Sequence, residues 1–133
     1  MIENFKFIER ITAENFLLEM IKLGNPLEIS LVGVFDEEGR GSRREMELPF
    51  HQDGDSPGFV FKNRIDYVGL YCIVGGEAET IIKINGSEEE HSFSLKEGQA
   101  IVFDNKNTVH ARRGIVGNRL LLRAWVEKRS MGK

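Results

Sequence analysis

The chain has 133 residues, the length of one domain and enough to bury a core without disulfides or a structural zinc ion. Apolar residues make up 41% of it and charged residues 29%, close to the averages for globular proteins, so disorder is not expected. The net charge of −3 gives no electrostatic reason to expect nucleic acid or an anionic membrane as a partner.

The single cysteine, Cys72, cannot form an intramolecular disulfide, which favours a reducing, cytoplasmic location. The opening run MIENFKFIER is mixed in charge and lacks a long apolar stretch, so it does not predict a signal peptide. No segment approaches the roughly 20 apolar residues that a membrane span needs. We therefore expect a single domain, 1–133, in the cytoplasm and away from membranes.

One helix is predicted, over 12–23. Thr12 is a suitable N-cap, and apolar residues between Phe16 and Ile21 recur at helical spacing. Gly24 is a natural end for the helix, and Pro26 could not continue it.

After the helix, the pattern predicts short strands separated by turn residues. The run DEEGRGSRR (36–44) predicts a turn, and Asn85-Gly86 predicts a tight hairpin. The expected strands are 27–35, 45–50, 67–74, 79–84, 91–95, 100–104, 108–112 and 119–127. Short strands at this spacing indicate a sandwich or jelly roll rather than a parallel α/β sheet. The expected fold is mainly β, a double-stranded β-helix (jelly roll) with one N-terminal helix.

A metal site is indicated by two of the three histidines. His51 lies in LPFHQDGD, and residues two apart at a strand end project from one face, so His51 and Asp53 could share a metal. His110 lies on a later predicted strand. Two imidazoles and one carboxylate are the ligand set of non-haem Fe(II) oxygen chemistry, although the same donors also accept nickel or zinc.

The ordinary alternative for this pattern is surface polarity, because an isolated H-x-D is common by chance. His91, in the charged run EEEHSFSL, fits a solvated strand edge, and we assign it no role.

The last predicted strand carries two arginines on one face. Arg119 and Arg123 alternate with Leu121 and Trp125, so their side of the strand is apolar as well as charged. An inward-facing charge is costly unless it is paired, and a guanidinium fork suits a carboxylate. The pattern favours a buried cavity filled by a ligand; arginines that point to solvent are the alternative.

Taken in order, LPFHQDG, GGEAET, GQAIVFDNKNTVHARR and RLLLRAWV resemble the Fe(II)/2-oxoglutarate-dependent dioxygenases, in particular the taurine dioxygenase-like branch. The resemblance covers roughly 48–127. It implies that His51, Asp53 and His110 bind Fe(II), with no catalytic residue beyond these ligands. It also implies 2-oxoglutarate as cosubstrate and an oxygenase that hydroxylates a small molecule.

The resemblance also assigns a cosubstrate site. It implies that Arg119 holds the distal carboxylate of 2-oxoglutarate and that the Thr80 hydroxyl bonds the same carboxylate. Arg123 would face either cosubstrate or substrate. Tyr71 is a further candidate for this carboxylate, and Tyr67 shares its face of the strand. Asn105 is expected to shape the turn before His110.

The interval between H-x-D and His110 is shorter than in the taurine dioxygenase-like branch and resembles prolyl-hydroxylase-like members, so the substrate stays unidentified. Specificity is expected in the loops 36–44 and 53–64, with Asp55, Phe59 and Phe61 near the mouth. A homodimer would cover exposed strand edges. The alternatives are a cupin-like metal-binding protein and a non-catalytic jelly-roll binding module.

Overall fold

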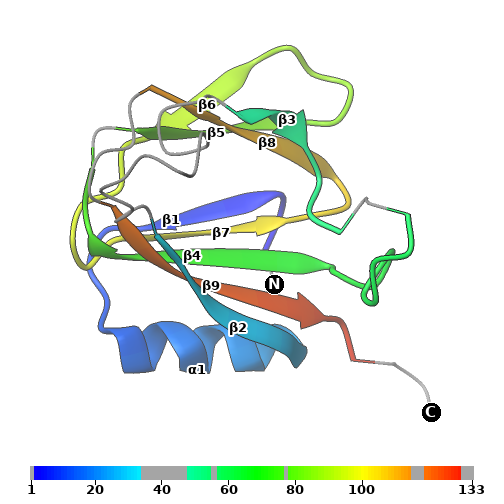
Figure 1. Cartoon of the computed structure of the whole chain (residues 1–133), viewed down its shortest axis with the longest axis horizontal. Helices are drawn as coiled ribbons and strands as arrows, with labels where there is room; N and C mark the ends of the chain where they lie inside the picture. Colours follow the sequence, from blue (N-terminus) through cyan, green and yellow to red (C-terminus); the bar gives the residue numbers. More distant parts are fainter. Residues whose placement is uncertain (1, 34–47, 55–56, 77, 115–118, 130–133) are drawn as a thin grey trace.

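A computed structural model describes residues 2–33, 48–54, 57–76, 78–114 and 119–129. Within these ranges the chain forms nine strands and one helix. The strands make two antiparallel sheets that face each other (Figure 1). This confirms the expected mainly β jelly roll with an N-terminal helix.

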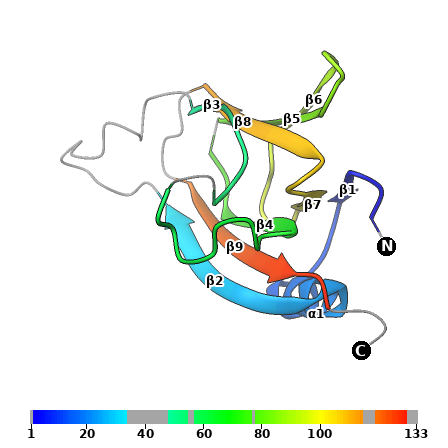
Figure 2. The same ribbon diagram turned by 90° about the vertical axis from the view of Figure 1, so that its right-hand side faces the viewer.

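The larger sheet has the order β1-β7-β4-β9-β2, and the smaller has the order β3-β8-β5-β6. The strands of the larger sheet are β1 (Phe5–Ile8), β7 (Ala100–Asp104), β4 (Tyr67–Val74), β9 (Leu120–Glu127) and β2 (Asn25–Gly33). Those of the smaller sheet are β3 (Leu48–His51), β8 (Thr108–Arg113), β5 (Glu79–Ile84) and β6 (Glu90–Phe93). Helix α1 (Ala13–Leu23) covers the outer face of the larger sheet (Figures 1 and 2).

Helix α1 begins and ends where the sequence predicts. The Thr12 side chain accepts a hydrogen bond from the Asn15 backbone N–H at 3.1 Å, and Gly24 is the C-cap. Phe16 and Met20 point into the sheet and are fully buried. Among the described residues, no helix has the length and apolar character to cross a bilayer.

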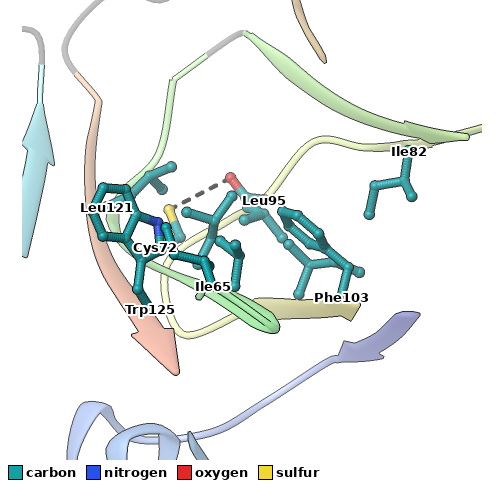
Figure 3. Close-up of a cluster of buried hydrophobic side chains, with 10 residues drawn as sticks. Ile65, Cys72, Ile82, Leu95, Phe103, Leu121 and Trp125 are labelled. Atoms are coloured by element: carbon teal, nitrogen blue, oxygen red, sulfur yellow. Dashed lines mark hydrogen bonds between the residues drawn. The ribbon is translucent and has the colours of Figure 1, made fainter. Parts of the chain in front are cut away.

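The two central strands, β4 and β9, send alternate side chains into two separate cores. Val68, Leu70 and Cys72 pack between the sheets, whereas Tyr67 and Tyr71 pack toward α1. The same alternation on β9 puts Leu121 and Trp125 between the sheets and Leu122, Ala124 and Val126 under the helix. Figure 3 shows the core between the sheets, where the Cys72 thiol lies 3.6 Å from the Leu95 carbonyl oxygen.

Three strands, β4, β5 and β7, have the predicted bounds, and the others differ by a few residues. Strand β2 begins at Asn25 and includes Pro26, which a strand tolerates at the edge of a sheet. Strand β1 was not predicted, because it is only four residues long and lies among charged residues. Positions 34–35 and 45–47 and the expected turn 36–44 lie outside the described residues.

Prediction for the helix–sheet contact. A Cβ at Gly69 would lie 2.5 Å from the Met20 sulfur and 2.8 Å from Cζ of Phe16. We expect Gly69→Ala to lower the free energy of unfolding by about 1–3 kcal/mol, because a buried contact becomes overpacked. Gly75→Ala is the matched control, since its nearest neighbour would be the Leu95 carbonyl oxygen at 3.4 Å. Urea unfolding measures both, and equal midpoints for the two variants would contradict the packing described.

Candidate metal centre

The smaller sheet brings the predicted metal ligands together. His51 at the end of β3 is paired in register with His110 on β8, and their rings lie 4.3 Å apart. Oδ1 of Asp53 lies 3.4 Å from Nε2 of His51 and 3.2 Å from Nε2 of His110. One candidate donor atom from each residue lies within 4.8 Å of the others, so the three could hold one ion.

His51 is oriented by its own backbone. Its Nδ1 lies 2.8 Å from the carbonyl oxygen of Pro49. A carbonyl oxygen only accepts, so Nδ1 carries the proton and, in the neutral ring, Nε2 presents its lone pair. That lone pair faces Oδ1 of Asp53, which is also an acceptor. A cation between them, either a proton or a metal ion, converts this repulsion into attraction.

His110 is oriented by packing. It is 9% exposed, and its ring lies 4.7 Å from that of Phe103. Its Nδ1 is buried and has no hydrogen-bond partner among the described residues. The ring is therefore held with Nε2 toward Asp53 by its neighbours rather than by a second hydrogen bond.

Asp53 lies beyond the end of β3, in a turn, so strand pleating alone does not place it. Its backbone N–H donates to the Asn105 side-chain oxygen at 3.0 Å, and its carbonyl accepts from Asn105 Nδ2 at 3.0 Å. Asn105 Nδ2 also donates to the Ile65 carbonyl at 3.0 Å. Asn105, expected only to shape the turn before His110, therefore clamps the loop that carries a candidate ligand.

The Asp53 carboxylate is mostly shielded from solvent, and the oxygen that does not face the imidazoles, Oδ2, has a hydrogen-bond partner. Oδ2 accepts a hydrogen bond from the Trp125 indole N–H at 2.8 Å. Burial raises the pKa of Asp53, but it is outweighed by the hydrogen bonds that His110 and His51 donate when protonated, by the charge of His110 and by the hydrogen bond from Trp125. The net effect holds the pKa of this carboxyl well below its usual range, so it is ionised at neutral pH.

A cavity of about 100 Å³ lies beside the three candidate ligands, between the sheets. Arg119 and Thr80 meet in it, with Arg119 Nη2 3.5 Å from the Thr80 hydroxyl. Burial, followed by the charge of Arg112, lowers the pKa of Arg119 to about 10. The cavity is lined by Val32, His51, Asp53, Val68, Leu70, Thr80, His110, Ala111, Arg112, Arg119, Leu121 and Arg123.

Arg123 reaches the same cavity along the inner face of β9. Its guanidinium lies over the Trp125 ring at 4.2 Å, and its Nη2 is 3.4 Å from the Ser30 hydroxyl. Arg119 Nη1 and Arg123 Nε are buried without a hydrogen-bond partner among the described residues. Two buried donors at one cavity suit a ligand that carries acceptor oxygens.

Tyr71 is not brought to this cavity. Its ring stacks on that of Phe16 at 5.6 Å, in the core under helix α1. Tyr67 packs into the same core. Both therefore face away from the metal centre, which corrects the expectation that Tyr71 binds the cosubstrate.

The remaining candidates have mainly packing roles. Phe59 and Phe61 pack edge-on against Trp125, with ring centroids 5.5 and 6.4 Å from it. His91, on the edge strand β6, packs 4.8 Å from the ring of Phe5. Gln52 points away from the centre and donates to the Lys106 and Thr108 carbonyls. Asp55 lies outside the described residues.

No family model and no curated protein matches the sequence. Among solved structures, PvcB, an Fe, alpha-ketoglutarate dependent oxygenase from an isonitrile synthetic pathway, is similar with a TM-score of 0.62 and 9% identity; the match covers 92% of this chain and 75% of that one. A 2OG-Fe(II) oxygenase family oxidoreductase from Burkholderia pseudomallei is similar with a TM-score of 0.52 and 16% identity; the match covers 65% of this chain. The chain spans 40% of the length of that oxygenase.

A further similar structure has a different activity. QdtA, a sugar 3,4-ketoisomerase from Thermoanaerobacterium thermosaccharolyticum in complex with TDP, has a TM-score of 0.56 and 12% identity; the match covers 98% of this chain and 85% of that one. At such identities these likenesses establish the fold alone. Proteins with this fold include 2-oxoglutarate oxygenases and a sugar isomerase, so the function must be argued from the site.

Prediction for the Asn105 clamp. In Asn105→Asp, an oxygen replaces the amide that donates to the Asp53 and Ile65 carbonyls. We expect the free energy of unfolding to fall by about 2–4 kcal/mol, because buried carbonyls lose their donor. Asn85→Asp is the matched control, since Asn85 Nδ2 donates one exposed hydrogen bond, to the Lys106 carbonyl. Urea unfolding of metal-free protein compares them, and similar losses would argue against the clamp.

Proposed function

We propose that the protein is an Fe(II)- and 2-oxoglutarate-dependent dioxygenase that hydroxylates a small molecule. One observation carries this proposal: two imidazole Nε2 atoms converge on Oδ1 of the ionised, mostly shielded Asp53 carboxylate, beside a cavity that the partly buried Arg119 lines. The similar fold of PvcB and of the Burkholderia oxygenase supports it.

The donor set fits Fe(II). Two neutral imidazoles and one carboxylate, from His51, His110 and Asp53, carry one negative charge and leave the other positions of an octahedral ion open. The Pro49 carbonyl fixes the proton of His51 on the nitrogen away from the centre, as is usual for metal-bound histidine. When bound, Fe(II) would supply the oxygen-activating redox chemistry that no side chain provides.

The cavity fits one end of 2-oxoglutarate. Arg119 stays protonated at neutral pH, since its pKa of about 10 is still well above neutrality. Its guanidinium and the Thr80 hydroxyl, 3.5 Å apart, could donate to the same carboxylate. This is the pair that the family resemblance implies, and it lies in the cavity that His51 and His110 also line.

The protein's own contribution is binding, orientation and exclusion of water. Val68, Leu70 and Leu121 form an apolar wall of the cavity, which strengthens charge interactions inside it. The asparagine and proline contacts fix the ligand directions before anything binds. In this proposal, Arg123 faces the cosubstrate or the substrate.

Prediction for the metal and cosubstrate. Anaerobic addition of 2-oxoglutarate to Fe(II)-loaded protein is expected to produce the weak visible charge-transfer band of a chelated complex. Asp53→Ala should abolish it, because the variant loses the only carboxylate among the candidate ligands. Iron binding without the band would remove 2-oxoglutarate from the proposal, and absence of iron binding would remove the metal centre.

Prediction for Arg119. Arg119→Met should leave Fe(II) affinity unchanged and weaken 2-oxoglutarate at least about 30-fold, because loss of one partner of a buried charged pair costs about 2–5 kcal/mol. Arg113→Met is the matched control: Arg113 makes an exposed pair with Glu90, away from the cavity. Titration calorimetry under nitrogen measures both affinities. An unchanged affinity for 2-oxoglutarate in Arg119→Met would contradict the assignment.

The second candidate is a cupin-like metal-dependent isomerase. The likeness to QdtA, which covers 98% of this chain, favours it. The isomerase function ranks second because it assigns no role to the Arg119–Thr80 pair beside the metal ligands. Conversion of TDP-4-keto-6-deoxyglucose without 2-oxoglutarate, followed by proton NMR, would favour the isomerase.

A further inference from the structure

The two oxygens of Asp53 have different surroundings. Oδ1 faces both imidazoles, whereas Oδ2 accepts the Trp125 indole N–H at 2.8 Å. An indole N–H only donates, and its hydrogen carries partial positive charge. A cation placed against Oδ2 would meet that hydrogen, so the ion is directed to Oδ1.

The indole itself is fixed in place. Trp125 is 7% exposed, Phe59 meets its ring at an interplanar angle of 90°, and the Arg123 guanidinium lies over its face at 4.2 Å. Rotation away from Asp53 would leave a buried N–H without an acceptor, which is costly. The hydrogen bond is therefore a constraint that persists when an ion binds.

We propose that Trp125 is a positioning residue that makes Asp53 a one-oxygen metal ligand. The inference rests on the proposed metal centre. An octahedral ion with three protein donors keeps three positions, and a chelating 2-oxoglutarate takes two of them. A second oxygen from Asp53 would fill the last position, so the indole N–H keeps it available.

Trp125 is the only tryptophan of the chain, so its side-chain N–H gives a single peak in a ¹⁵N correlation spectrum. We expect this peak to lie downfield, to move upfield in Asp53→Ala, and to shift when the wild type is titrated with Zn²⁺. The shift should saturate at one ion per chain. A peak that saturating Zn²⁺ leaves in place overturns the inference, whatever the variants show.

Trp125→Phe keeps a ring against Phe59 and Arg123 but removes the N–H. We expect Zn²⁺ affinity, measured by titration calorimetry, to fall about 10- to 100-fold, as is typical when a partner of a metal ligand is lost. Phe59→Leu is the control, because it removes an aromatic contact from the same indole and leaves the N–H. Circular dichroism checks that each metal-free variant is folded.

The outcomes separate the inference from the proposed function. If the wild type and Trp125→Phe bind Zn²⁺ equally, Trp125 has no positioning role and the metal centre stands. If Phe59→Leu loses as much affinity as Trp125→Phe, ring packing rather than the hydrogen bond is responsible, and the inference fails. If the wild type binds neither Zn²⁺ nor Fe²⁺, the metal centre fails and the inference fails with it.

Discussion

The arrangement between the sheets depends on one ionised carboxylate that is mostly shielded from solvent. The side chain of Asp53 is 11% exposed, so its charge must be compensated largely by protein groups. These groups are His51 at the end of β3, His110 on β8 and Trp125 on β9. Asn105, in the turn after β7, holds the backbone of Asp53 rather than its carboxylate. They converge only when the two sheets face each other. The fold is thus required for the centre, and the Trp125–Asp53 hydrogen bond links the larger sheet to the turn after β3.

Side chains alternate between the two faces of a strand, and this alternation is why much of the fold and of the candidate site was predictable from the sequence. Along β9 and the residue before it, a period of two separates Arg119, Leu121 and Arg123, which line the cavity, from Leu122, which packs under the helix. The helix caps and the bounds of three strands also followed from local chemistry, because each depends on residues within a few positions of each other. The grouping of His110 with His51 and Asp53 was implied by the family resemblance, and the fold brings the three together.

What the sequence did not reveal depends on contacts between distant segments. Trp125 was grouped with Leu121 as an apolar residue on the arginine face, because nothing local indicates that its N–H meets a carboxylate 72 positions earlier. Asn105 looked like a turn residue, and its clamp exists only because Asp53 and Ile65 are brought to it. Tyr71 was assigned through the family, but its parity on β4 matches Tyr67 and Gly69, which face the helix. The sequence showed that Tyr67 and Tyr71 share a face of the strand, but not that helix α1 covers this face.

The charge balance of the cavity links stability to binding. Among the described residues, Arg119 and Arg123 line it with one carboxylate, Asp53, and Arg123 also has Glu28 at 4.0 Å. Burial lowers the pKa of Arg119 to about 10, which disfavours the cation without discharging it at neutral pH. Two buried donors there, on Arg119 and Arg123, lack partners among the described residues. An anion that bound these donors would offset the desolvation of the guanidinium groups and the repulsion between them. Part of its binding free energy would therefore come from removing a cost that the free protein already bears. A dicarboxylate that also chelates a cation at Oδ1 of Asp53 would compensate the positive charge of the arginines, and the cation would compensate the negative charge of Asp53, in one cavity.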